Sequence, residues 1–470
     1  MSAAPVSRDD HLLLVPSPAH DALLVQVDDT GERRWPTVTG GRLRELDEVL
    51  ADVGRLAGSG LVFLRSAGRA EESLGEPGAA AGAGQSPTRR TVLLVFDALA
   101  VPPADLPGPG RWAWCPLDDA ASVGPALPAA LEVPFARWVD ELRGAPAPAQ
   151  RPAWSNPGGI APFLAWLDEE VRATGAAPQG DPEVLQQWGV SLVVRQRTDR
   201  GPLFGKAVGA VFATEPTITR LLARDAPGSV PDVLALDEER GWVLLADARI
   251  RPIAGAEAAE GLRALARRQR AWIGRTDALR AAGCPDRGPA TLADDLAASL
   301  EDLELATELA PVRGLDGTER ARLRALLPAF ADLCREAEDD GAPLTLLHGD
   351  CHPGNVGVRD DGSVCILDWS DAAVGHPFVD VDVWLSHVAD DERGALRDAY
   401  LAEWPEVADG EAALLRADVL CAAYQVVTSQ RLLRALEEDE WPGFANGMSF
   451  WARRVLERYD LLVGAVSRSA

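Results

Sequence analysis

Apolar residues along this chain occur either in short continuous runs, which predict strands, or three and four positions apart, which predicts helices. The predicted strands lie mainly in the N-terminal half of the chain, and the predicted helices mainly in the C-terminal half. Short apolar runs rich in β-branched residues, with turn residues at their ends, predict strands within residues 11–27, 92–101, 190–198, 202–208 and 230–247. Apolar residues three and four positions apart predict helices at 134–143, 158–174 and 212–226, then at about 257–282, 291–308, 316–339, 391–402, 410–437 and 446–463. The chain beyond residue 250 is therefore expected to be mainly helical.

One stretch beyond residue 250 interrupts the helical pattern. Residues 356–358 and 364–369 are apolar and flank the turn sequence RDDGS, which predicts a β-hairpin. Because the two strands of a hairpin run side by side, residues just before the first strand and at the end of the second are brought together. The hairpin therefore predicts that Asn355 and Asp368 lie near each other.

The length of the chain and a proline-rich segment predict its domains. A chain of 470 residues is too long for one ordinary core, and the sequence GAPAPAQRP at 144–152 is typical of a semi-extended linker. We expect an α/β accessory or cap domain at 1–146, a small β-rich lobe with a leading helix at 153–250, and a helical lobe at 251–470.

The amino-acid composition indicates which kinds of molecule the protein can bind and in which compartment it works. The net charge of −26 disfavours nucleic acid, whose phosphates it would repel, and would tolerate cationic small molecules. No apolar run reaches the length of a membrane span, and the first residues show no signal-peptide pattern. The six cysteines show no metal-binding spacing and predict reduced thiols in a cytoplasmic protein. We expect a small-molecule substrate and no nucleic acid or membrane partner; the oligomeric state stays open.

Lysine usage marks one position. Lys206, in the sequence GPLFGKAVG, is the only lysine among 46 basic residues. Lysine carries a compact charge, whereas arginine carries a wide planar fork. A single lysine in a chain that otherwise uses arginine either marks a site that arginine cannot fill or has survived by chance.

The segment LHGDCHPGNVGVRDDGSVCILDWS at 347–370 carries the clearest candidate chemistry. Asn355 and Asp368 would supply two oxygen ligands of the kind that Mg²⁺ prefers, with phosphate and water completing its coordination. Asp350 lies one short loop earlier and could accept a proton from an incoming hydroxyl group. An Asp, four intervening residues, an Asn and a second Asp on the next hairpin are the arrangement used for phosphoryl transfer by protein kinases.

HGDCHPGNV followed by ILDWSDAAVGHPFVDV resembles the aminoglycoside phosphotransferase and choline kinase-like superfamily, over about residues 183–460. This resemblance implies an α+β, bilobal protein-kinase-like fold, with a small β-rich N-lobe and a helical C-lobe. The preceding α/β accessory domain is similar to the arrangement in actinobacterial maltokinases and glucosamine kinases. The resemblance also implies ATP and Mg²⁺ as cofactors.

For the reacting groups, the resemblance implies a role for each matching residue. Asp350 would be the catalytic base, and Asn355 and Asp368 would be the Mg²⁺ ligands. His348 would brace the catalytic loop, and Asp380 would hold the backbone of that loop as a buried carboxylate.

For the nucleotide and the acceptor, the resemblance implies a second set of roles. Lys206 would contact the α- and β-phosphates, and Glu215 would pair with it. Residues 242–248 would form the hinge strand that meets adenine. Asp371 and Trp441 are candidate substrate residues, although a solvated turn residue and a core tryptophan are the alternatives.

These observations lead to three functional hypotheses. The first is a phosphotransferase that moves the γ-phosphate of ATP to a hydroxyl of a small polar molecule, such as an aminoglycoside or similar antibiotic. The second is a kinase of maltose, glucosamine or another sugar, which the extra N-terminal domain favours. The third is a catalytically inactive nucleotide-binding protein. This hypothesis is disfavoured because the chain keeps every residue expected to bind nucleotide and metal or to act as the base: Lys206, Glu215, Asp350, Asn355 and Asp368.

Overall fold

A computed structural model of the chain describes residues 8–41, 49, 61–73, 88–98, 111–309, 314–437 and 440–469. Backbone contacts divide the chain into two compact units. The first comprises Met1–Ala165 with Val184–Leu192, and the second comprises Trp166–Glu183 with Val193–Ala470. The domain boundaries that the sequence predicts at residues 146, 153 and 250 stay predictions.

The first unit is rich in β-strands. One sheet has the strand order β4-β1-β6-β5, in which β1 and β6 are parallel and the other pairs are antiparallel; a second sheet has the order β3-β2-β7. The strands are β1 (Arg8–Leu14), β2 (Ala22–Val27), β3 (Arg33–Arg34), β4 (Thr37–Gly41), β5 (Leu61–Ser73), β6 (Thr88–Ala98) and β7 (Arg111–Pro116). Strand β6 lies between two neighbours and is buried on both faces, which explains its unbroken apolar run.

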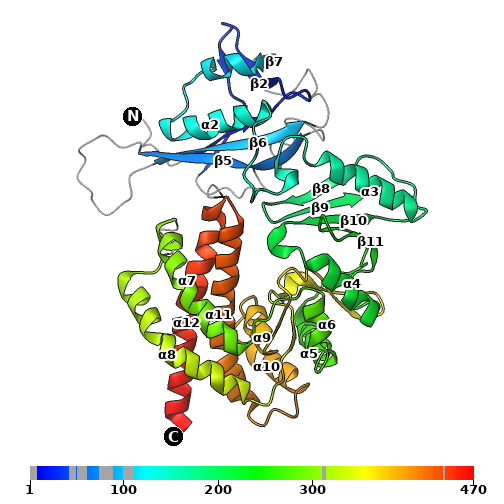
Figure 1. Ribbon diagram of the computed structural model, residues 1–470, viewed down its shortest axis with the longest axis vertical. Helices are drawn as coiled ribbons and strands as arrows, with labels where there is room; N and C mark the ends of the chain where they lie inside the picture. The colour runs from blue at the N-terminus through cyan, green and yellow to red at the C-terminus, as the bar shows by residue number, and fades with distance from the viewer. Residues whose placement is uncertain are drawn as a thin grey trace. The chain divides into compact units, whose positions relative to one another are not determined.

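One long helix completes the core of this unit. Helix α2 (Ala129–Leu142) packs against β5 and buries Trp138 completely. Gly68 of β5 faces Pro134 of this helix, and a Cβ atom at Gly68 would lie only 2.9 Å from the proline ring. Because glycine has no side chain, the helix can approach the strand closely at this position. An extra β-rich region is therefore present in the N-terminal part of the chain, with a helix against one of its sheets (Figure 1).

A five-stranded sheet follows in the chain, with the order β11-β12-β10-β9-β8. Its strands are β8 (Glu183–Gln187), β9 (Ser191–Gln196), β10 (Leu203–Val208), β11 (Val233–Asp237) and β12 (Trp242–Ala246). Helix α3 (Ala161–Ala173) precedes the sheet, and α4 (Glu215–Asp225) connects β10 to β11. The helices predicted at 158–174 and 212–226 are thus confirmed within a few residues.

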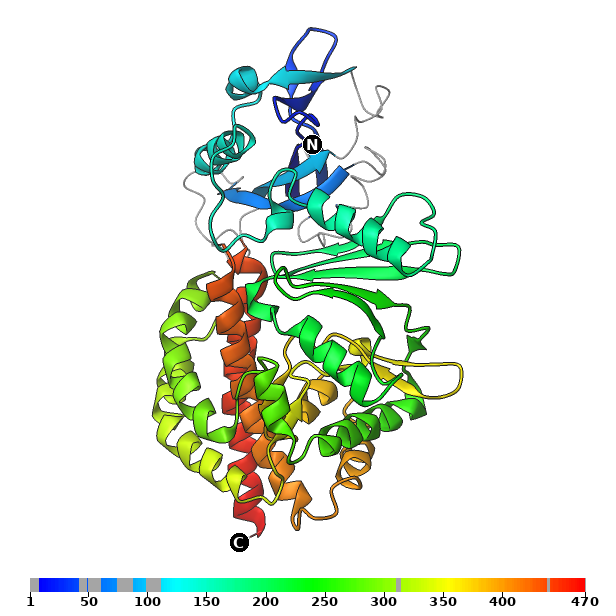
Figure 2. The same cartoon turned by 45° about the vertical axis from the view of Figure 1, so that its right-hand side comes forward.

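Helices dominate the rest of the chain, in agreement with the predicted fold class. They are α5 (Ala258–Ala271), α6 (Thr276–Ala281), α7 (Pro289–Leu309), α8 (Gly317–Glu338), α9 (Val379–Leu385), α10 (Arg393–Leu401), α11 (Gly410–Ala435) and α12 (Trp441–Ser469). Helices α7, α8, α11 and α12 lie side by side and share one apolar core, as Figures 1 and 2 show. No helix in the described part of the chain is long and apolar enough to cross a membrane.

Two details of the helical prediction are wrong. The single helix expected at 257–282 is two helices, α5 and α6, because Gly274 adopts a φ of +72° between them, a left-handed conformation that ends a helix. Helix α9 was not expected. All seven of its residues are buried, so it lacks the alternation of apolar and polar faces that identifies a surface helix.

Short strands embedded among these helices frame the segment 347–370. The predicted hairpin is confirmed as β15 (Val356–Val358) and β16 (Val364–Ile366), which pair in antiparallel fashion with Val356 opposite Ile366. Strand β13 (Arg251–Pro252) adds to β15, and β14 (Thr345–Leu347) pairs with β17 (Ala373–Gly375). These two small sheets support both ends of the loop that carries the candidate chemistry.

Candidate active site

The loop after β14 is held by a buried carboxylate. Asp380, at the start of α9, accepts hydrogen bonds from the backbone N–H groups of His348 and Gly349, each at 2.8 Å. Gln269 of α5 donates a third hydrogen bond to the same carboxylate at 2.9 Å. Burial raises the pKa of Asp380 to about 6, and the three donors oppose that shift. The unexpected helix α9 therefore positions a group that fixes the loop backbone.

His348 links this loop to the hairpin. Its Nε2 lies 2.8 Å from the carbonyl oxygen of Leu367, and its Nδ1 accepts a 3.3 Å hydrogen bond from the Asp350 N–H. A carbonyl oxygen can only accept, so Nε2 carries the proton and the ring is neutral. Complete burial lowers the pKa of His348 to about 4, in agreement with a neutral ring. The imidazole also packs on Trp369, with 4.7 Å between ring centroids.

Gly349 allows the loop to approach Asp371. Its φ is +83°, and a Cβ atom there would lie 2.4 Å from the carbonyl oxygen of Asp371 and 2.7 Å from Tyr424 Oη. Tyr424 donates its own hydroxyl hydrogen to that carbonyl at 2.8 Å. A side chain at Gly349 would therefore push apart the loop, the Asp371 segment and helix α11.

This crowding predicts a large loss of stability for Gly349→Ala. Gly362, in the hairpin turn, has the same φ of +83° but open space around its Cβ position, so Gly362→Ala is the matched control. The control should lose about 1–2 kcal/mol from backbone strain alone. Gly349→Ala should lose about 1–3 kcal/mol more, because it adds overpacking. Urea unfolding of the two variants measures the difference; equal losses would contradict the close approach.

Lys206 joins two carboxylates that are distant in the sequence. On β10, its Nζ lies 2.6 Å from Glu215 Oε1 at the start of α4 and 2.9 Å from Asp368 Oδ1 after β16. Burial lowers the pKa of Lys206, but the two negative charges outweigh it and the net pKa is raised. The ammonium is thus held charged at a point where three segments meet.

Asp368 occupies a special backbone position. Its φ is +57°, a left-handed conformation that is uncommon for a residue with a side chain and that is found more often at functional sites. Burial raises the pKa of its carboxyl group, but Lys206 outweighs burial and the net pKa is lowered, so the group is ionised. The side chain keeps 45% of its surface exposed, so a ligand can reach it.

Asn355 lies across the hairpin from this carboxylate. Its backbone carbonyl accepts a 2.8 Å hydrogen bond from the N–H of Leu367, the residue before Asp368. Its side-chain Nδ2 donates to the backbone oxygen of Asp350 at 3.0 Å, which leaves the amide Oδ1 as its possible cation ligand. One ionised carboxylate and one amide oxygen fit Mg²⁺, which takes few protein ligands when phosphates supply others. Among the described residues, no group of three His, Cys, Asp or Glu side chains could hold a metal ion.

Asp350 is the carboxylate best suited to accept a proton. Burial raises its pKa to about 7, and the negative charges of Asp371, Asp368 and Asp380 add to the shift. Its side chain still keeps 45% of its surface exposed, and His352 Nε2 lies 3.8 Å from its Oδ2. A base works best when its pKa lies near the working pH, so this environment suits proton transfer at neutral pH.

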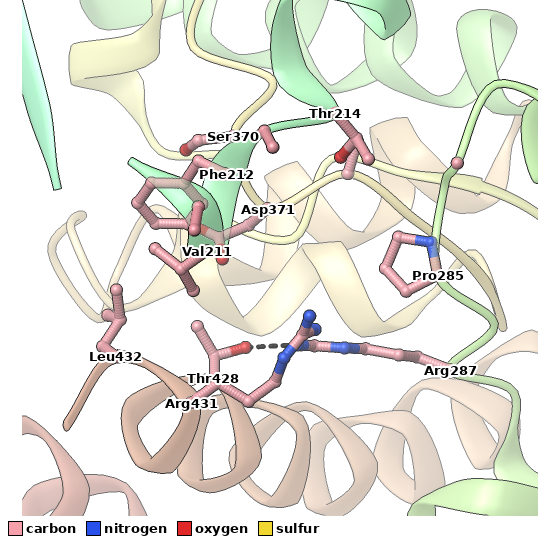
Figure 3. A pocket seen from close by; sticks show the side chains of 14 residues that line it. Val211, Phe212, Thr214, Pro285, Arg287, Ser370, Asp371, Thr428, Arg431 and Leu432 are labelled. Atoms are coloured by element: carbon pink, nitrogen blue, oxygen red, sulfur yellow. Dashed lines mark hydrogen bonds between the residues drawn. The ribbon is translucent and has the colours of Figure 1, made fainter. Parts of the chain in front are cut away.

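A pocket of about 130 Å³ opens beside Asp371. Figure 3 shows its lining, which comes from the segment before α4, the segment before α7, residues 370–372 and helix α11. Burial raises the pKa of Asp371 to about 6, while the nearby Arg287 and Arg431 oppose that shift. Of the two predicted substrate residues, the structure brings Asp371 to this pocket.

Trp441 does not line that pocket. It lies at the start of α12, packs against the core shared by the C-terminal helices and donates its indole N–H to the Leu436 carbonyl at 3.1 Å. Its contact with a substrate stays a prediction. The structure instead brings Arg287, Thr428 and Arg431 to the pocket. No motif in the sequence marked these three residues. Arg287 and Thr428, for example, are 141 positions apart in the sequence.

Residues 213–415 match the sequence profile of a family described as "Phosphotransferase enzyme family". No curated protein matches the chain. The matched segment contains Glu215, Asp350, Asn355 and Asp368, while Lys206 lies just before it.

Several solved structures align with the chain at low identity. A macrolide 2'-phosphotransferase type I is 19% identical with a TM-score of 0.41, over 60% of this chain and 95% of that one. The choline kinase LicA from Streptococcus pneumoniae is 13% identical with a TM-score of 0.43, over 63% and 99%. A choline kinase from Cryptosporidium parvum Iowa II is 11% identical with a TM-score of 0.48, over 65% and 97%. At these TM-scores, the structural similarity carries no functional conclusion.

The sequence match falls on the segment that contains the motif HGDCHPGNV and the loop, hairpin and carboxylates described above. The family resemblance seen in the sequence is thereby confirmed. Residues 213–415 of this chain are thus similar to the phosphotransferase enzyme family.

Proposed function

We propose that this protein transfers the γ-phosphate of ATP, in an Mg²⁺-dependent reaction, to a hydroxyl group of a small polar molecule. The observation that carries the proposal is the meeting of Lys206, Glu215 and Asp368. These residues lie on β10, on α4 and after β16, and Lys206 is 162 positions from Asp368. In protein kinases, phosphoryl transfer needs a lysine on a strand, a glutamate on a helix that pairs with it, and a metal-binding aspartate. The ion pairs of Lys206 bring together one residue of each type.

The nucleotide end of the site uses the lysine. Lys206 would contact the α- and β-phosphates as a compact charge, while Glu215 holds the ammonium in place. Strand β12, which runs antiparallel to β10 with Val243 opposite Lys206, forms most of the segment 242–248 that would meet adenine through its backbone. The ammonium and the adenine-binding backbone would thus be fixed on neighbouring strands.

Asn355 and Asp368 would hold the metal ion. When bound, Mg²⁺ supplies positive charge to the phosphate oxygens. Asp368 is fixed for this purpose by Lys206 on one oxygen, and Asn355 is fixed by its bond to the Asp350 carbonyl. The two ligands are therefore oriented by contacts within the protein.

Asp350 would accept the proton of the acceptor hydroxyl as the hydroxyl oxygen bonds to the γ-phosphorus, while the bond from that phosphorus to the bridging oxygen of ATP breaks and ADP leaves. Its backbone is held through His348, whose Nδ1 accepts the Asp350 N–H, and through the bonds of Asp380 to the preceding residues. Most of the rate enhancement in phosphoryl transfer comes from positioning and charge stabilisation. A rigid loop is accordingly the main contribution of this part of the fold.

Binding of ATP with and without Mg²⁺ tests the cofactor assignment. Isothermal titration should show tighter binding to the wild-type protein with Mg²⁺ than with EDTA. Asp368→Asn should weaken binding roughly 10-fold or more with Mg²⁺, because a charged ligand is lost. Asp360→Asn, at an exposed turn position of the same hairpin, should leave binding unchanged. Binding of ATP that ignores Mg²⁺ would contradict the assignment.

A further inference from the structure

The pocket beside Asp371 contains two arginines that form no ion pair with a carboxylate of the described residues. Arg287 is 7% exposed, and its Nη1 donates a 2.6 Å hydrogen bond to Thr428 Oγ1. Its guanidinium also lies over the ring of Tyr424, with 4.7 Å to the centroid. No ion pair within 4.0 Å is found for Arg287 among the residues that the structure describes. A buried cation without a paired anion is unusual, because burial of an unpaired charge is costly.

Arg431 adds a second positive charge to the same place. It lies on α11, one turn after Thr428, and Figure 3 shows its guanidinium next to that of Arg287. Burial lowers the pKa of Arg431, and repulsion from Arg287 adds to the shift. Within the described part of the chain, the Arg431 side chain makes no hydrogen bond or ion pair. Two neighbouring guanidinium groups thus converge on one pocket without a bonded counter-charge.

This arrangement differs from the rest of the charged surface. Many other arginines in the described part of the chain pair with carboxylates; on the same face of α11, Arg434 lies 2.7 Å from Asp302. The chain has 72 acidic against 46 basic residues, so acidic partners are plentiful. Asp371 lies near both guanidiniums, yet it is not within ion-pair distance of either among the described residues and balances one charge at most. The pocket therefore keeps an excess of positive charge.

We infer that the acceptor substrate carries an anionic group, a carboxylate or a phosphate or sulfate ester, which binds to Arg287 and Arg431 while its hydroxyl group faces Asp350. The inference rests on the proposed function and names the substrate class of that site. Paired guanidiniums suit planar or tetrahedral oxyanions, which accept several N–H bonds at once.

The size and lining of the pocket fit a small acceptor. Its volume of about 130 Å³ is below the roughly 300 Å³ at which pockets begin to enclose drug-sized ligands. Val211, Phe212, Pro285 and Leu432 give the pocket an apolar wall, as Figure 3 shows. A small hydroxy acid or sugar acid fits this lining, whereas the polycationic aminoglycoside suggested by the family resemblance would place like charges beside the two arginines.

Binding of inorganic sulfate to the full-length protein tests the anion site apart from turnover. We compare the wild type with Arg431→Gln, which removes a guanidinium that makes no hydrogen bond or ion pair with the described residues, and with Arg434→Gln as the matched control on the same helix. Sulfate at constant ionic strength should raise the melting temperature of the wild type and of Arg434→Gln, and its affinity for Arg431→Gln should be about 10-fold lower. Equal affinity in all three proteins would overturn the inference.

Turnover supplies the second readout. ADP release is followed with glycerate and gluconate, with the uncharged amide of each acid, and with kanamycin. The anionic acceptors should be preferred, and Arg431→Gln should raise their KM about 10-fold with little change in kcat. Preference for the amides or for kanamycin would overturn the inference even if turnover is fast. Sulfate binding that depends on Arg431, together with no ADP release from any acceptor of either charge, would support the anion site and count against the proposed function.

Discussion

Asp350→Asn is expected to lower kcat by roughly 10²–10⁴-fold, the usual effect of removing a general base. Asparagine keeps the size of the side chain and cannot take up the hydroxyl proton. The fold should survive, because the contacts that hold this part of the loop use the backbone N–H and carbonyl of Asp350. Steady-state ADP release, measured with saturating ATP and acceptor, gives the change in kcat.

Two controls separate the loss of the base from other causes. ATP binding by Asp350→Asn should stay within a few-fold of the wild type, because Lys206 and Asp368 are untouched. Asp360→Asn makes the same chemical change at an exposed turn position and should leave kcat unaltered. Wild-type turnover by Asp350→Asn would show that another group accepts the proton.

Lys206→Arg is expected to lower kcat/KM by about 10²-fold or more, although the charge is kept. The ammonium fits between Glu215 and Asp368 at 2.6 and 2.9 Å, with only 11% of its side chain exposed. A planar guanidinium is wider and bonds in a fixed fork, so it would displace Asp368 from its position. A displacement of about 1 Å in a catalytic group can cost 10²-fold in rate.

The reverse exchange provides the control. Arg172 on α3 pairs with Asp168 at an exposed position, and Arg172→Lys should leave kcat/KM unchanged because exposed ion pairs contribute little. Steady-state kinetics of both variants measures the contrast. Full activity of Lys206→Arg would mean that the single lysine of the chain has survived by chance.

The sequence was most informative where chemistry depends on local spacing. The hairpin that brings Asn355 and Asp368 together follows from two apolar runs and a turn of five residues, so neighbouring positions were enough to predict it. The scarcity of lysine also singled out Lys206 before any contact was known. Its pairing with Glu215 is local as well, since the two residues are nine positions apart.

Features that depend on contacts between distant segments could not be predicted in this way. Arg287 and Arg431 resemble the many other arginines of the chain, and only the fold shows that they share a pocket. Helix α9 is buried on all sides, so the pattern that reveals other helices is missing. The role of Asp380 in binding two backbone N–H groups was expected from the family resemblance, but its geometry depends on that unpredicted helix.

The most direct test of a phosphotransferase is detection of its product. The wild-type protein is incubated with Mg²⁺, ATP labelled at the γ-phosphate and the acceptor set used above, and the products are analysed by mass spectrometry. We predict that one acceptor gains a single labelled phosphoryl group as an ester of its hydroxyl, in equal amount to the ADP formed, and that Asp350→Asn forms little of it. ADP formed together with free labelled phosphate, and no labelled acceptor, would contradict the proposed transfer.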